Sequence, residues 1–423
     1  MKRQYSHHAH RIVLRRAVTV IFFLTASLPL VAQDAGDLRI FGSMQSIFMY
    51  QDSRIRGTFP DPSLNYKVSE ARNTFALQQL DLFLDKELDD SFSAFIDLEF
   101  QLNYSSENHW GSLSLQEAWL NYHYSDALSL KTGLLYPAFN HLNEIKNRLG
   151  LLPYIFRPLV YERLLSGRFL TEDFIPEHAF LQLYGSIPTG SFFLDYAVYA
   201  GNAEASYITS SNPDGTISTD VNAGFEFLSG VDPTDFNLKL VGGRIGVRTR
   251  DELWKAGLSF THDYNNLRDT VLLGNYILPQ SARQILGDDA ERLRLGGDVS
   301  FRHGIFSFEG EVIKVLYNYK PAKQLGLQAE QGFAYGYVGC DVVPAVTVYG
   351  SLQWSDYYFG VDAAYFVYTV GSAVRLNNSL TAKAQFLVYD ELHEDVLLEG
   401  SVMPIHDQRV TINFAFLGIS VLL

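Results

Sequence analysis

Apolar and polar residues alternate with a period of two through much of this chain. The stretch from Ser91 to Ser105 shows the pattern most clearly. Its apolar face carries Phe92, Ala94, Ile96, Leu98, Phe100, Leu102 and Tyr104. A period of two is typical of a β-strand with one apolar face. This face has aromatic rings at both ends and aliphatic side chains in the middle, which is the order of a lipid-facing strand.

The same alternation predicts about sixteen strands. We expect them to begin near residues 38, 73, 91, 112, 127, 178, 191, 238, 253, 291, 305, 332, 345, 363, 380 and 409. One strand changes phase within its length, because Leu113 and Leu115 share a phase with Glu117, whereas Ala118 and Leu120 take the other. Such a change predicts a β-bulge.

The predicted connections alternate between short and long. Those after even-numbered strands are tight turns, and those after odd-numbered strands are longer. The longer ones cover about 51–72, 105–111, 137–177, 202–237, 265–290, 320–331, 356–362 and 390–408. Transmembrane barrels have this arrangement, with short periplasmic turns and long outer loops. The sequence therefore predicts an all-β fold, a closed antiparallel transmembrane barrel formed by residues 33–423, and sixteen strands would enclose a water-filled lumen.

The first 32 residues have the layout of a secretory signal peptide. Basic residues including Lys2, Arg3 and Arg11 precede an apolar run from Ala17 to about Val31, and Ala32 could be the last residue before cleavage. The alternative, a transmembrane anchor, needs roughly 20 apolar residues, and this run is shorter. Export with a single cysteine, Cys340, excludes an intrachain disulfide. We expect the mature chain to lie among the lipids of the outer membrane of a Gram-negative bacterium.

The long third loop, residues 137–177, adds a family resemblance. Together with the strand count, the motifs Phe41-Gly42 and Gly133-Leu134-Leu135-Tyr136-Pro137 make the chain similar to outer-membrane porins, specifically the phosphate-selective porin O/P-like group. The chain departs from the family at its end, which is Val421-Leu422-Leu423 and not an aromatic residue.

The resemblance implies that the third loop folds into the lumen and narrows it. It also implies passive diffusion of small hydrophilic solutes or ions, with anions such as phosphate as one class, and assembly as a homotrimer. A second function class stays open, a non-conducting barrel that binds a ligand or a surface through its long outer loops, residues 202–237 and 265–290.

Charge marks the third loop as unusual. The chain has a formal net charge of −14. Between Asn143 and Leu170 the loop nevertheless gathers five cations against only Glu144 and Glu162. These cations are Lys146, Arg148, Arg157, Arg163 and Arg168. Two roles remain open for them: they line the pore constriction, or they pin the loop to carboxylates of the barrel wall.

Strand phase also sorts the side chains of the wall. The residues predicted to point inward on the early strands are Asp81, Asp85, Asp97, Glu99 and Glu117. Later strands place inward Arg244, Arg292, Arg294 and Asp298, and at their periplasmic ends Arg248, Lys255 and Arg302. The last three could be ordinary rim charges. An acidic wall would then face a basic wall across the water, and the resulting field would favour polar solutes.

Other chemistry is not indicated. The histidines form no close metal-ligand pair, so no metal and no cofactor are expected. No nucleophile has an identifiable base partner, so no enzyme is expected. The acidic balance argues against nucleic acid as a partner.

Overall fold

The computed structural model describes nine ranges of the chain. They are residues 38–58, 61–103, 112–162, 174–202, 238–265, 290–318, 330–358, 362–396 and 405–423. The predicted signal peptide, residues 1–32, lies outside them. No helix among the described residues is long and apolar enough to cross a membrane.

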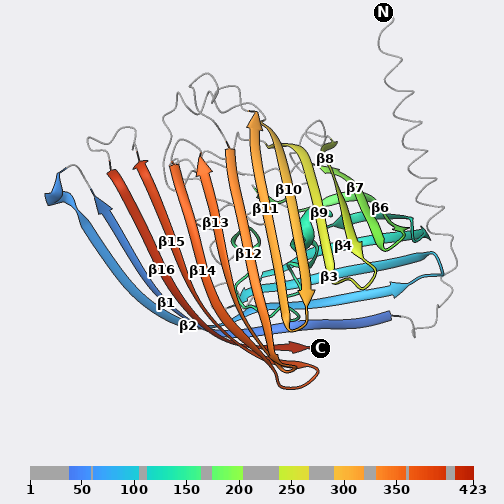
Figure 1. Cartoon of the computed structure of the whole chain (residues 1–423), viewed down its shortest axis with the longest axis horizontal. Helices are drawn as coiled ribbons and strands as arrows, with labels where there is room; N and C mark the ends of the chain where they lie inside the picture. Colours follow the sequence, from blue (N-terminus) through green and yellow to red (C-terminus); the bar gives the residue numbers. More distant parts are fainter. Residues whose placement is uncertain are drawn as a thin grey trace, which may run out of the picture. The chain divides into compact units, whose positions relative to one another are not determined.

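Sixteen antiparallel strands form one closed barrel, in which each strand pairs with its neighbours in sequence and β1 pairs with β16 (Figure 1). The first eight are β1 Leu38–Thr58, β2 Tyr66–Glu87, β3 Phe92–Asn103, β4 Ser112–Ser125, β5 Leu128–Leu135, β6 Ala179–Thr189, β7 Phe192–Asn202 and β8 Leu238–Thr249. The other eight are β9 Trp254–Asn265, β10 Ala290–His303, β11 Phe306–Asn318, β12 Glu330–Val343, β13 Val346–Tyr358, β14 Asp362–Arg375, β15 Leu380–Val396 and β16 Ile405–Leu422. Within the described ranges three short helices lie between strands: η2 Pro62–Leu64, α2 Asn140–Ile145 and η4 Leu159–Tyr161.

The closed antiparallel barrel confirms the predicted fold class. Observed strand starts agree with the predicted ones within two residues, except for β2 and β16. The predicted first outer loop, residues 51–72, was wrong, because β1 continues to Thr58 and β2 already begins at Tyr66. Most of the first half of β2 is exposed on both faces. Beyond the hydrocarbon both faces of a strand meet water, so the alternation that marks a strand disappears there.

The predicted bulge in β4 is present. Asp97 of β3 pairs with Glu117, but the next residue, Leu98, pairs with Leu115, so Gln116 is the extra residue. Gln116 is buried, and both Gln116 and Glu117 bind Tyr136, the residue that follows β5. The bulge therefore supplies two polar side chains to the start of the third loop.

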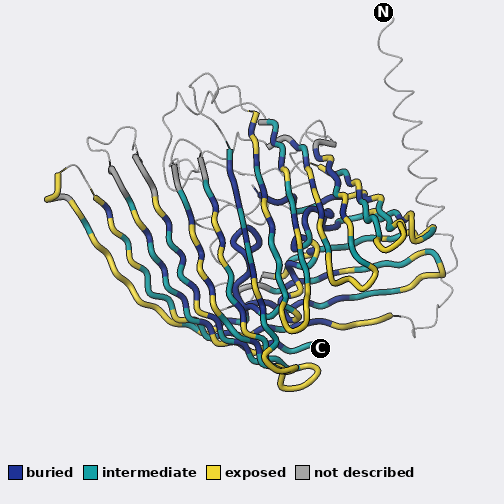
Figure 2. Tube along the Cα trace, viewed as in Figure 1, coloured by how far each residue is buried: buried dark blue, intermediate teal, exposed yellow. Residues whose placement is uncertain are grey.

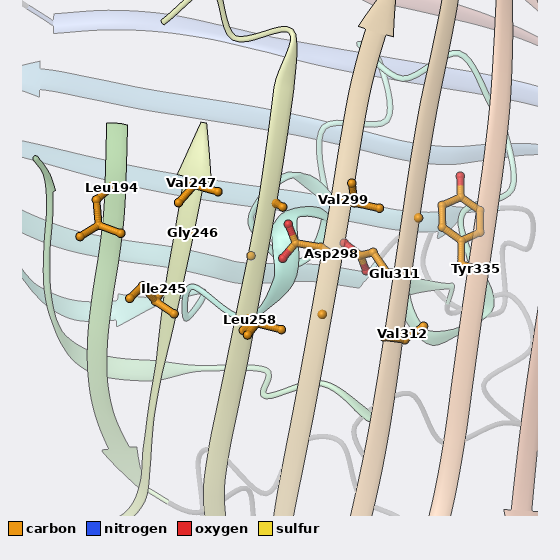
Figure 3. Close-up of a pocket in the computed structure, with 14 residues that line it drawn as sticks. Leu194, Ile245, Gly246, Val247, Leu258, Asp298, Val299, Glu311, Val312 and Tyr335 are labelled. Carbon is orange, nitrogen blue, oxygen red and sulfur yellow. The ribbon is translucent and has the colours of Figure 1, made fainter. Parts of the chain in front are cut away.

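Burial alternates along the strands as the phase predicted (Figure 2). Ile96 is 39% exposed, whereas Asp97 and Glu99, on the other face of the same strand, are at most 2% exposed. The outer face also has a hollow of about 640 Å³ over β7 to β12 (Figure 3). It is lined mainly by apolar side chains, among them Leu194, Ile245, Val247, Leu258, Val299 and Val312. This outer face is suited to hydrocarbon.

A candidate pore constriction

Residues at the bulge of β4 are hydrogen-bonded to Tyr136, the residue just before the third loop. Tyr136 donates its hydroxyl to Gln116 Oε1, and its backbone N–H donates to Glu117 Oε1 at 3.2 Å. Asn147 Nδ2, from later in the loop, donates to the Tyr136 hydroxyl at 2.7 Å. The Lys146 ammonium lies 4.3 Å from the centre of the same ring. Tyr136 thus joins the first turn of the loop to its middle.

Helix α2 is seated on β9, β10 and β11. The N–H of Asn140 donates to Ser259 Oγ at 3.0 Å, and the N–H of Leu142 donates to Glu311 Oε1 at 2.8 Å. Gly296 provides the space, because a Cβ at that position would lie 2.3 Å from Asn140 Oδ1. The side chains that hold this helix are buried and belong to strands far from β5 in sequence.

The part of the loop after Leu152 is bound through its backbone by glutamine side chains. Gln385 Oε1 on β15 accepts from the N–H groups of Ile155 and Phe156 at 2.7 and 2.8 Å. Gln353 Oε1 on β13 accepts from the N–H of Leu159 at 2.6 Å. An irregular segment has backbone groups without a ladder partner, and burial makes such groups costly unless they are bonded. These glutamines satisfy them.

Two further contacts hold the middle of the loop, and one holds its end. Gln79 Nε2 on β2 donates to the carbonyl of Asn147 at 2.7 Å, and Lys383 Nζ on β15 donates to the carbonyl of Leu149 at 2.8 Å. Tyr161 donates its hydroxyl to Glu311 at 2.6 Å. Burial and the nearby Glu311 carboxylate raise the pKa of Tyr161 well above its usual value, so this hydroxyl remains a donor.

Apolar packing accompanies these bonds. The ring of Phe156 lies 6.4 and 6.3 Å from the rings of Phe414 and Phe416 on β16. Ile155 is fully buried, and a Cβ at Gly418 would lie 3.1 Å from its Cδ1. The inner wall therefore buries these apolar side chains of the loop.

Two of the five loop cations are buried within the loop. Arg157 is 5% exposed, its Nη1 donates to the carbonyl of Lys146 at 3.0 Å, and its Nε lies 3.7 Å from Glu162. Lys146 is buried beside Tyr136. Neither side chain projects into water, so both act as ties inside the loop.

The remaining loop cations differ in what the structure shows. Arg148 is exposed. Arg163 and Arg168 lie outside the described residues. Among the described residues the hydrogen-bond and ion-pair partners of Arg157 all belong to the loop, so this side chain holds the loop together and neither lines the pore nor bonds to a wall carboxylate. Lining stays open for Arg148.

The acidic wall points inward, as its phase indicated, but it is buried. Asp81, Asp97 and Glu99 are at most 2% exposed. Asp81 lies opposite Glu99, and Asp97 opposite Glu117, on paired strands. Inward orientation was predictable from alternation; burial was not.

The expected basic wall needs correction, because its arginines are paired within their own wall. Arg292 binds Asp263 through Nε at 2.9 Å and Nη2 at 2.6 Å, and Arg294 Nη1 reaches the same carboxylate at 3.0 Å. Arg244 binds Asp298 at 3.2 and 2.6 Å. Asp263 was missed in the sequence, although its phase on β9 places it inward. These pairs weaken the field expected between the two walls.

Arginine and lysine residues near the periplasmic strand ends behave as rim charges. Arg248 pairs with Asp195 at 2.9 Å, and Lys255 with Glu252 at 3.2 Å. The side chain of Arg302 is 61% exposed. The Lys255–Glu252 pair is partly exposed, and pairs near the surface contribute little to stability.

Two cavities among the described residues are lined partly by the loop. One, of about 290 Å³, is lined by residues including Glu144, Gln182, Tyr184, Arg244 and Arg248. The other, of about 410 Å³, is lined by residues including Leu151, Leu152, Lys255, Glu309 and Tyr337. The described part of the chain holds no group of three or more side chains that could hold a metal ion.

Comparison with known proteins identifies the fold. No protein-family model matches the chain, and no curated protein matches it. Among solved structures it is similar to an anion-selective porin from Comamonas acidovorans, with a TM-score of 0.54, 11% identity, and coverage of 91% of this chain and 99% of that one. It is also similar to the outer membrane channel DcaP of Acinetobacter baumannii, with a TM-score of 0.51, 12% identity, and coverage of 92% and 97%.

A third similar structure is OmpT, an outer membrane protein of Vibrio cholerae, with a TM-score of 0.50, 10% identity, and coverage of 91% and 97%. All three cover nearly the whole barrel. The chain therefore has the fold of outer-membrane porins. Its place in the phosphate-selective group stays a prediction.

Proposed function

We propose that this protein is an outer-membrane porin that passes small hydrophilic solutes or ions by passive diffusion, without enzymatic activity. The observation that carries the proposal is a closed barrel with an apolar outer face and an interior that holds charged side chains and open cavities. The likeness in fold to an anion-selective porin and to the channel DcaP supports it.

In this proposal the third loop, residues 137–177, forms the constriction. Its described part is hydrogen-bonded to side chains of β2, β9, β11, β13 and β15, which lie around the closed barrel. A segment that reaches all these inner faces must reduce the open cross-section.

The proposed ion preference differs from the anion preference that the family resemblance implied. Arg157 and Arg244 are each paired with a carboxylate, and Arg292 and Arg294 share that of Asp263. The described interior also holds Asp81, Asp97, Glu99 and Glu311, so it is acidic in balance. An acidic lining favours cations. A preference for anions such as phosphate would require the exposed Arg148 together with Arg163 and Arg168, which lie outside the described residues.

Two parts of the proposal rest on the sequence. Residues 1–32 would direct export to the outer membrane and be removed. A homotrimer is proposed from the porin resemblance.

Conductance is the test. The purified mature chain, added to a planar lipid bilayer, should form ohmic channels with no energy source. Heat-modifiable migration on a gel should show that the barrel is folded in the same sample. A folded protein that never conducts would contradict the proposal.

One observation favours a second candidate, a non-conducting binding barrel. Buried loop residues, among them Phe139, Ile155 and Phe156, belong to one apolar cluster with residues of the wall, which is also what a closed plug would need. Deletion of the outer loop at 203–237 distinguishes the porin from the binding barrel. A porin should keep its conductance after the deletion, whereas a binding barrel would lack conductance beforehand and lose ligand or surface attachment.

A further inference from the structure

We propose that Gly257 is a positioning residue that sets the ion preference of the pore, because it provides a flat seat on which the Arg244 side chain lies against the wall beside Asp298. The inference rests on the proposed channel function. It identifies a determinant of selectivity that carries no charge itself.

Arg244 reaches across a whole strand to its partner. On β8 it lies opposite Ser259 of β9, while Asp298 of β10 lies opposite Gly257. The guanidinium therefore spans two strand separations, roughly 9–10 Å between backbones. It binds Asp298 through both Nε and Nη2, at 3.2 and 2.6 Å. Figure 3 shows Gly246 on β8 and Asp298 on β10, with the strand that carries Leu258 between them.

Two glycines, Gly257 and Gly246, leave room for the Arg244 side chain along this path. A Cβ at Gly257 would lie 2.4, 2.7 and 2.8 Å from Nη2, Cζ and Nε of Arg244. No side chain tolerates such distances, so the guanidinium would have to move. Gly246, which pairs with Gly257, is less tight, since its Cβ would lie 3.2 Å from Arg244 Nη1.

The seat lies directly beside the candidate constriction. Ser259, two residues from Gly257 on the same face, binds the first residue of α2, Asn140. Arg244 also lines the cavity of about 290 Å³ that it shares with Glu144 of the loop. A guanidinium lifted from the wall would enter this cavity.

Lifting the arginine changes the charge that a passing ion meets. In the pair, the side chain of Arg244 is 16% exposed and that of Asp298 is 3% exposed, so the two present little net charge. After displacement the cation would face water while the carboxylate stayed at the wall. Permeation should then shift toward anions with no change in total charge.

The experiment measures reversal potentials in a potassium chloride gradient for four proteins: wild type, Gly257→Ala, Arg244→Gln and the double variant. We expect Gly257→Ala to lower the cation-to-anion permeability ratio about twofold, because a unit charge moved by a few ångströms alters its interaction with an ion in water by that order. In the Arg244→Gln background, Gly257→Ala should have no effect. The matched control is Gly297→Ala on β10, whose Cβ would meet only Val312 Cγ2, at 3.3 Å, and ordinary contacts beyond it.

A second variant guards against misfolding of the first. Asp298→Asn releases Arg244 without touching the glycine and should shift selectivity in the same direction, by more than Gly257→Ala. A wild type that does not conduct overturns the channel function itself. The proposed role of Gly257 is contradicted if the wild type conducts and Gly257→Ala leaves its selectivity unchanged. It is also contradicted if Gly257→Ala still shifts the selectivity in the Arg244→Gln background.

Discussion

The inner wall of the barrel has two unlike halves. From β11 through β16 it is largely apolar, with buried Phe333, Val367, Leu387 and Phe414 among its side chains. From β2 through β10 it carries carboxylates and arginines at the corresponding inward positions. The third loop packs its own apolar residues on the first half. An apolar patch inside a water-filled barrel would be unfavourable if left bare, so such a patch predicts a segment that covers it.

The largest effect should come from removing an apolar contact on the covered half. Phe156→Ala should lower the free energy of unfolding by about 3–5 kcal/mol, because the ring is 3% exposed and its loss leaves a cavity. The loop should also loosen and conductance rise. Denaturant titration and bilayer recordings measure the two effects.

The control for that change is another apolar residue of the same loop. Leu151 is 64% exposed, so Leu151→Ala should change stability by less than about 0.5 kcal/mol. Equal losses in the two variants would mean that the wall does not hold the loop.

Two arginines of the loop should give opposite results. Arg157→Ser should destabilise the protein by roughly 3 kcal/mol, because it leaves buried Glu162 without its cation, and should leave selectivity almost unchanged. Arg148→Ser should leave stability unchanged and shift the reversal potential toward cations, because Arg148 is exposed. If Arg157→Ser alters selectivity without loss of stability, the description of Arg157 as a tie is wrong.

A smaller effect is expected from the glutamines. Gln385→Ala removes the acceptor of two buried loop N–H groups and should cost about 1–3 kcal/mol. Gln331 is equally buried on the same half of the wall, but its amide atoms have no hydrogen-bond partner among the described residues. Gln331→Ala should therefore cost clearly less in the same denaturant titration. Similar costs would show that Gln385 acts through packing and not through the loop backbone.

Alternation predicted the strands well because the hydrocarbon imposes it. It could not say which face is inside once both faces are apolar. In β16, Phe414 and Phe416 look like lipid-facing residues, yet they are buried and the loop residue Phe156 packs on them, whereas Leu417 and Ile419 are exposed outside. The period finds such a strand, but only the loop contacts assign its faces.

The candidate site was less predictable for a related reason. The sequence identified the loop and its cations, and it placed the wall charges inward. It could not pair Arg292 with Asp263 or Arg244 with Asp298, because those pairs depend on register between strands and on side-chain reach. Nor could it show that Gln116 and Glu117 both serve Tyr136, which needs the bulge and the loop together.

The central claim of the proposal is that solutes pass beside Glu144 and Arg244, which line one cavity, while the loop covers the apolar half of the wall. Single-channel recording with cysteine modification tests it in a Cys340→Ser background. The first variant, Glu144→Cys, changes an exposed loop residue that lines the same cavity as Arg244. A water-soluble thiol reagent should reduce the current through this variant. In Tyr349→Cys, which lies 6% exposed on the covered half, the reagent should have no effect. A current reduced only at position 349, or equally at both positions, would contradict the account.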